Sequence, residues 1–141
     1  MISRMTQRCL SSLLFMLALV PASSVAQKCK GLDVKYESEI QYPNSARAAR
    51  IQGDVTLQVH IVTDGTVTAN IVSGPSVLAE SAKRFVESWT VAWLHDAPPT
   101  ACDPVLHVTY KLKGNFNVKT KLPTRIVVEA PPIETNEPSP H

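Results

Sequence analysis

The sequence is short of glycine, of aromatic residues and of long apolar runs. It has five glycines among 141 residues, and 6% of its residues are aromatic. The glycines form no phosphate-binding loop, which excludes the nucleotide-binding motifs that depend on one. The most apolar stretch, residues 10–20, is eleven residues long, whereas a membrane-spanning helix needs about 20.

Recognisable catalytic sets are also missing. None of the four histidines stands beside a cysteine or at a fixed spacing from a nucleophilic serine, and the carboxylates are scattered singly. His60 and His107 fall on solvent-facing positions of predicted strands, and two histidines without a third ligand make a weak metal site. The sequence therefore predicts a protein that is not an enzyme and that has no cofactor and no metal.

The N-terminus has the pattern of an export signal. Two arginines precede the short apolar run, and Ser24-Val25-Ala26 offers small residues for cleavage. This pattern predicts a Sec-type signal peptide over residues 1–26 and a periplasmic mature protein. The alternative is an uncleaved segment that anchors the protein in the inner membrane.

Charge is balanced once this segment is removed. The chain has 14 basic and 12 acidic residues, and both Arg4 and Arg8 lie in the predicted signal, which leaves 12 of each. A neutral composition has neither the basic excess typical of nucleic-acid binding nor a polybasic patch for anionic lipid. We therefore expect no nucleic-acid partner, and membrane contact only if the signal is uncleaved.

Cysteine is scarce but suits an exported chain. Of the three cysteines, Cys9 lies in the predicted signal, which leaves Cys29 and Cys102. Two cysteines in an oxidising compartment favour a disulfide between them, and two free, half-buried thiols are the alternative. A thiol enzyme is not indicated, because there is no Cys-x-x-Cys motif.

The clearest structural pattern is a β-hairpin over residues 55–71. Apolar and polar residues alternate in both halves, around Thr63-Asp64-Gly65. A two-residue loop would mix the faces, whereas a three-residue loop pairs Ile61 with Val67 and continues one apolar face. Such a loop needs a positive φ at its last residue, which Gly65 supplies.

Two helices are predicted around this hairpin. The second begins near Pro75 and carries an apolar stripe at three- and four-residue spacing that reaches Trp89. The first begins near Pro43, and Gly53 fits a left-handed cap at its end. The order helix, hairpin, helix, strand predicts an α+β fold, with two helices packed on one face of a small antiparallel sheet.

An ordered set of residues resembles the C-terminal domain of TonB proteins. The matching positions are Gln41-Tyr42-Pro43, Ala46-Arg47, Arg50-Ile51, Gly53, Val55, Asp64-Gly65, Val67, Ser73-Gly74, Leu78, Ala82, Trp89 and Val108-Thr109-Tyr110-Lys111-Leu112. The order and spacing carry the resemblance, since each pair is common by itself. The chain departs from the family after Trp89, where the usual aromatic and proline are replaced.

The resemblance sets the expected boundaries. We expect a short arm at residues 27–41, which forms either an added edge strand or an extended segment. The domain itself is expected at residues 42–130, with the family's last strand at residues 105–113. An extra strand is predicted at residues 125–129, and a disordered tail at residues 131–141.

The resemblance also implies a function. TonB C-terminal domains bind a segment of outer-membrane receptors by strand addition along their last strand, so the expected partner is such a receptor or another envelope protein. The implied partner-binding residues are Tyr42, Pro43, Arg47, His107, Thr109 and Lys111. The role would be accessory to TonB-dependent transport across the outer membrane. The alternative is a structural or homodimerising envelope module whose sheet edge is capped by the extra strand.

Overall fold

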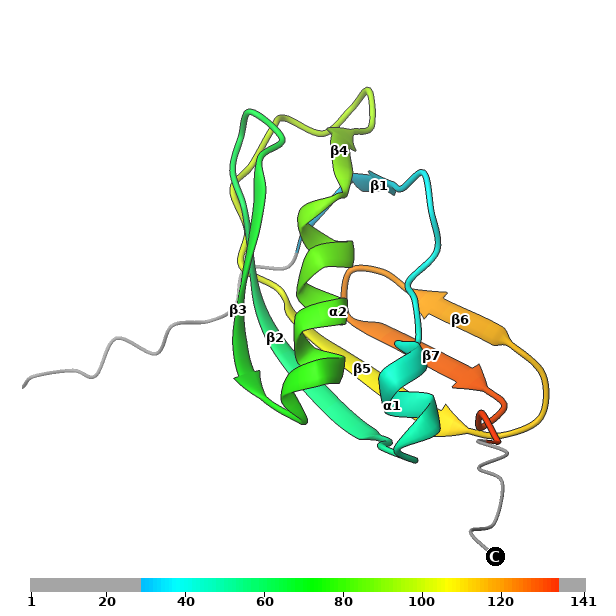
Figure 1. The fold of residues 1–141 in the computed structure, drawn as a ribbon. Helices are drawn as coiled ribbons and strands as arrows, with labels where there is room; N and C mark the ends of the chain where they lie inside the picture. Colours follow the sequence, from blue (N-terminus) through cyan, green and yellow to red (C-terminus); the bar gives the residue numbers. More distant parts are fainter. Residues whose placement is uncertain (1–28, 135–141) are drawn as a thin grey trace, which may run out of the picture.

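The computed structural model describes residues 29–134, and its centre is a five-stranded sheet in the order β3-β2-β5-β7-β6. Helices α1 and α2 lie on one face of this sheet, and β1 and β4 form a second, two-stranded sheet (Figure 1). The elements are β1 (Leu32–Lys35), α1 (Asn44–Ala48), β2 (Gly53–Ile61), β3 (Val67–Ser73), α2 (Ser76–Glu87), β4 (Thr90–Trp93), β5 (Val105–Leu112), β6 (Asn117–Lys121) and β7 (Arg125–Ala130). The predicted α+β class is confirmed.

The predictions for both ends of the chain fall largely outside the described part. The signal peptide expected at residues 1–26 lies wholly outside it, and the tail expected at residues 131–141 is described only as far as residue 134. Within residues 29–134, no helix has the length and apolar character needed to cross a membrane.

The β2–β3 hairpin has the predicted register. Ile61 lies opposite Val67, Val59 opposite Ala69, and Leu57 opposite Ile71. Gly65 has a φ of 90°, as a three-residue loop requires. The apolar residues of β2 therefore share one face, which is buried against the helices.

Helix α2 covers this apolar face. It begins directly after Pro75, and its buried stripe includes Leu78, Ala82 and Phe85. Trp89 lies just beyond the helix and is also buried, with its ring edge-to-face against Phe85 at 5.9 Å. The predicted stripe is confirmed as core packing, in which each large apolar side chain contributes about 1.5–3 kcal/mol by burial.

The predicted end of the first helix is wrong. Helix α1 ends at Ala48, and the left-handed residue that follows it is Arg50, with a φ of 56°. Gly53 also has a positive φ, of 145°, but it is the first residue of β2. The chain turns at Arg50, and the N–H of Ile51 then donates to the carbonyl of Ala46, which closes the end of the helix.

The arm before the domain forms a strand, but not in the main sheet. Strand β1 pairs antiparallel with β4, which places Leu32 opposite Trp93 and Val34 opposite Val91. Cys29, just before β1, forms a disulfide with Cys102, so the predicted pairing is confirmed. Cys102 in turn exchanges backbone hydrogen bonds with Ile61 at the end of β2.

The C-terminal strands complete the sheet in an order that the sequence pattern did not reveal. Strand β7 lies where the extra strand was predicted, and it pairs parallel with β5 rather than antiparallel. Strand β6, which was not predicted, pairs antiparallel with β7 and forms the outer edge (Figure 1). The chain thus passes beyond the position next to β5 and then returns to fill it.

Candidate functional site

The first candidate is the side of β5 that faces away from β2. Backbone groups alternate along an antiparallel strand, and Val59 and Ile61 of β2 donate toward the segment that leads into β5. In the paired register, His107, Thr109 and Lys111 therefore direct their backbone groups to the opposite side of β5. These three are the residues of β5 that the resemblance implies for partner binding.

Strand β7 already occupies that side. The N–H of His107 donates to the carbonyl of Thr124 at 2.9 Å, and the N–H of Lys113 donates to the carbonyl of Ala130 at 2.9 Å. Between these bonds, β5 and β7 pair residue by residue. The backbone of β5 therefore has no free edge in this structure.

The side chains of β7 also belong to the core. Ile126, Val128 and Ala130 are completely buried on the helix side of the sheet. Burial of the isoleucine and the valine alone contributes about 3–6 kcal/mol. A partner strand at β5 would have to supply comparable apolar side chains in place of these.

Two of the implied N-terminal residues serve the fold. Tyr42 is 4% exposed; its hydroxyl donates to the carbonyl of Ile51 at 2.6 Å, and its ring packs edge-to-face on Tyr110 at 5.1 Å. Burial raises the pKa of the Tyr42 hydroxyl, and the nearby positive charge of Arg47 opposes this shift. Pro43 stands at the start of α1 and lines a shallow cavity of about 350 Å³ beside α2.

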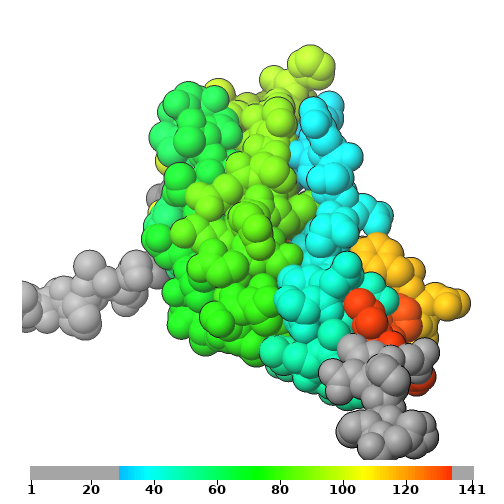
Figure 2. All heavy atoms as spheres, in the orientation of Figure 1, coloured from blue at the N-terminus to red at the C-terminus, as the bar shows by residue number. Residues whose placement is uncertain are grey.

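That cavity lies where the segment before α1 runs along α2. Figure 2 shows this face, with α2 in green beside the preceding segment in cyan. Its lining is mixed, with Phe85 and Pro43 among hydroxyl groups and with one cation, Arg84, and one anion, Glu39. Balanced charge and shallow shape give this cavity no clear ligand class.

Arg47 forms a hydrogen bond with the segment that follows β7. Its Nε donates to the carbonyl of Pro131 at 2.8 Å, and one of its terminal nitrogens contacts the Asn44 side chain at 3.4 Å. The bond to Pro131 joins residues 84 positions apart, directly after the end of β7. Arg47 thus contacts the residue that directly follows the strand on the side of β5.

Arg47→Ala is therefore expected to lower the free energy of unfolding by about 1 kcal/mol, because a charge-assisted hydrogen bond at a half-buried position is lost. Urea denaturation measures this change. Arg50→Ala, at an exposed neighbouring arginine, is the control and should change stability less. Equal effects of the two substitutions would contradict a specific role for the contact with Pro131.

The open face of the sheet, which carries no helix, holds a row of polar contacts. Thr109 donates its hydroxyl to Asp54 at 2.7 Å, and His107 lies 3.4 Å from the hydroxyl of Thr56. Lys111 is exposed on the same face. The three side chains of β5 thus remain accessible although the backbone beside them is paired.

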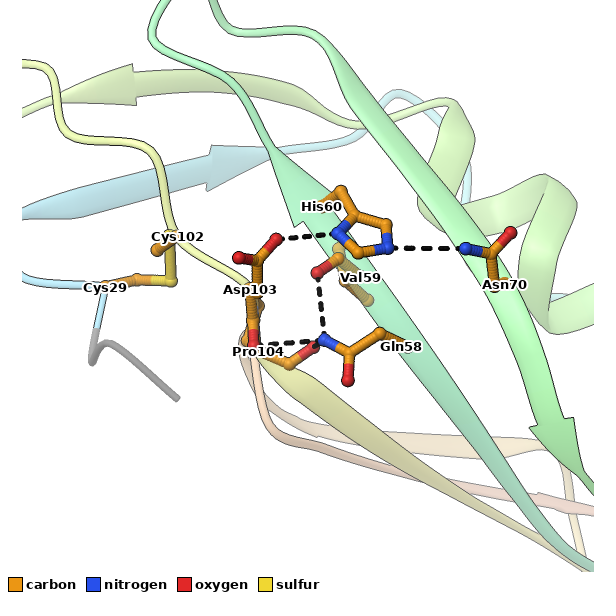
Figure 3. A network of polar contacts seen from close by, with 8 residues as sticks. All are labelled: Cys29, Gln58, Val59, His60, Asn70, Cys102, Asp103 and Pro104. Carbon is orange, nitrogen blue, oxygen red and sulfur yellow. Dashed lines mark hydrogen bonds and ion pairs between the residues drawn. A yellow bond between two sulfur atoms is a disulfide. The ribbon is translucent and has the colours of Figure 1, made fainter. Parts of the chain in front are cut away.

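His60 makes the most compact polar network on this face. Its Nδ1 lies 2.6 Å from a carboxylate oxygen of Asp103, and its Nε2 lies 3.3 Å from the amide nitrogen of Asn70 (Figure 3). A neutral ring with its proton on Nδ1 satisfies both contacts. In a catalytic dyad or triad, the nucleophile would lie at Nε2 of the histidine. In this network the side-chain amide of Asn70 lies there, so the His60–Asp103 pair resembles a catalytic dyad only in part.

The two strand histidines do not form a joint site. His107 lies opposite Thr56, four positions along β2 from His60, and each ring has its own partners. Across residues 29–134, no group of three or more histidine, cysteine or acidic side chains is arranged to hold a metal ion.

The two outer strands of the sheet differ in character. Strand β6 has five residues, two of them the exposed lysines Lys119 and Lys121. Strand β3 has seven residues, from Val67 to Ser73, and carries neither a charge nor a proline. Natural edge strands are commonly protected by lysine or proline against pairing with other chains, and only β6 has this protection.

The uncharged composition of β3 was visible in the sequence, but its place at an edge was not. A strand shows its edge position only through its neighbours, and the neighbours of β5 depend on the unpredicted strand β6. The resemblance therefore implied an open edge at β5, with capping by the extra strand as the alternative, whereas the described part of the chain leaves β3 and β6 as the outer strands.

Comparison with known families places these edges in context. The model of the family described as Gram-negative bacterial TonB protein C-terminal matches residues 38–112. The match spans 75 of 141 residues, and so more than half of the chain. It ends with β5, so β6 and β7 are additions to the family's region. No curated protein matches the chain.

Proposed function

Because the chain belongs to the family of TonB protein C-terminal domains, we propose that it is a periplasmic protein-binding module, accessory to TonB-dependent transport across the outer membrane. It binds an extended segment of an outer-membrane receptor or another envelope protein as an added strand. The family supports the involvement in TonB-type envelope transport. The added strand is supported by the open, uncharged edge of β3.

The edge of β3 has the backbone groups that strand addition needs. Since Val62 at the end of β2 donates its N–H to Thr66, the even-numbered residues around β3 direct their backbone groups toward β2. Val67, Ala69 and Ile71 therefore direct theirs outward, away from the described part of the protein. An extended partner segment gains about 0.5–1.5 kcal/mol for each hydrogen bond that it forms there.

A specific observation favours a second candidate, the self-capped structural module. Strand β7 fills the side of β5 along its length, and Arg47 binds the carbonyl of Pro131 directly after it. In this reading, the additional strands replace the partner, and the domain has a purely structural role in the envelope.

An NMR titration tests the first proposal. The exported protein is labelled, purified and titrated with peptides from the N-terminal segments of outer-membrane receptors. We expect the largest amide shifts at Val67, Ala69 and Ile71. We also expect Ile71→Pro to weaken binding, because proline removes an outward N–H without breaking a bond to β2.

Thr120→Pro is the matched control. Thr120 is the corresponding position on β6. The N–H of Thr124 donates to the carbonyl of Lys121, so the odd-numbered residues of β6 direct their backbone groups toward β7, and Thr120 directs its own outward. This variant should bind peptide as the unmodified protein does. Shifts centred on β5 and β7 would instead mean that the peptide displaces β7, and no shifts at millimolar peptide would favour the self-capped module.

A further inference from the structure

Within the described part of the chain, the edge of β3 has exposed apolar side chains as well as backbone groups that no other strand pairs with. Val72 is 63% exposed, Ile71 is 38% exposed, and Val62, at the end of the neighbouring strand, is 45% exposed. Three of the five large apolar side chains that stand exposed in residues 29–134 are therefore on or beside one edge strand. Another chain that paired with β3 would cover part of this surface.

The pattern of β3 suits pairing with itself. Two antiparallel copies related by a two-fold axis at Ala69 place Val67 of one copy opposite Ile71 of the other. All three residues direct their N–H and C=O groups outward, so each of these opposed pairs can form hydrogen bonds. No like charges meet, because β3 carries none.

The opposite edge is unsuited to the same arrangement. Two copies of β6 would bring Lys119 and Lys121 of one chain close to the same lysines of the other. Like charges directly opposed across a strand pair are destabilising. The contrast between the edges selects β3 as the self-complementary one.

We propose that, when no partner segment is bound, two copies of this protein join their β3 edges into a continuous sheet, so that a second copy and the partner compete for one edge. The inference rests on the proposed function in that it uses the same edge. The bulge between Thr56 and Leu57, opposite Val72, limits the regular ladder to Val67–Ile71. The pairing is therefore short, and a weak dimer that a partner segment can displace is expected.

Sedimentation velocity of the exported, purified protein tests this inference. We expect a monomer–dimer equilibrium as the concentration rises to about 1 mM. Ile71→Pro removes one outward N–H from each copy and should weaken the dimer about tenfold or more. Thr120→Pro, on the opposite edge, should leave the equilibrium unchanged.

A second variant guards against misfolding of the first. Val72→Lys adds a charge at an exposed side chain beside the pairing run and should also weaken the dimer, whereas Val72→Thr should weaken it less. A protein that stays monomeric at all concentrations, or a dimer that is weakened by Thr120→Pro but not by Ile71→Pro, would overturn the inference.

Adding receptor peptide separates this inference from the proposed function. If both hold, excess peptide converts the dimer to a monomer–peptide complex. If peptide shifts Val67–Ile71 of a protein that never dimerises, the function stands and the inference fails. If the dimer forms through β3 and no receptor peptide dissociates it, the inference of self-association stands, competition is refuted, and the proposed function fails.

Discussion

Ile126→Ala is expected to lower the free energy of unfolding by about 2–5 kcal/mol, as large-to-small substitutions do in well-packed cores. Ile126 lies on β7, beyond the region that matches the family, and its side chain is completely buried. Since β7 stands between β5 and β6, the loss affects a central strand rather than a removable tail. Urea denaturation followed by circular dichroism measures the change.

Val127→Ala provides the control for this prediction. Val127 is the next residue on the same strand, but it is half-buried and points to the open face of the sheet. Its substitution should cost well under half as much as that of Ile126. If both variants unfold at the urea concentration of the unmodified protein, β7 does not contribute to the core, and the side of β5 becomes available to a partner.

The parts of the fold that the sequence predicted are those governed by local spacing. The register of the β2–β3 hairpin follows from a loop length that keeps Val59 and Ile61 on the same face as Val67 and Ala69. The stripe of α2 follows from helical periodicity in the same way. In both cases one buried face fixes the arrangement, and all the partners lie within a short stretch of chain.

The order of the last strands could not be predicted for the opposite reason. Strand β6 reads Asn-Val-Lys-Thr-Lys, with a single apolar residue, because an outermost strand buries little. The four residues 113–116 reach at most about 13 Å, which is sufficient to carry the chain past one strand position. The return of β7 beside β5, parallel to it, thus depends on long-range packing and not on a local pattern.

Long-range packing also decides whether the backbone groups of β5 are free to bind a partner. The residues of β5 that the resemblance implies are correctly placed on a strand, and their backbone groups do point away from β2. Whether such groups are free is decided by the residues that follow the family's region, where His107 meets Thr124 and Lys113 meets Ala130. A site made of backbone groups is therefore less visible in a sequence than one made of catalytic side chains.

Loss of the disulfide is expected to lower the free energy of unfolding by an amount similar to that of Ile126→Ala. In the Cys29→Ser/Cys102→Ser variant, we expect the free energy of unfolding to fall by about 4 kcal/mol, because the bridge closes a loop of 73 residues. The loss of stability should also differ between parts of the fold. Strand β1 pairs in the described residues only with β4, so the bridge next to it limits how far the arm can detach.

Hydrogen exchange separates these two consequences. Without the bridge, amides of Leu32–Lys35 and Thr90–Trp93 should exchange faster than the lower global stability requires, whereas those of β2 and β5 should follow global unfolding. Reduction of the unmodified protein should reproduce the behaviour of the double variant, since it breaks the same bond without changing Cys102 in its buried position. If the reduced protein and the variant both unfold like the oxidised protein, the pairing of β1 with β4 is sufficient by itself, and the bridge is not needed to hold the arm.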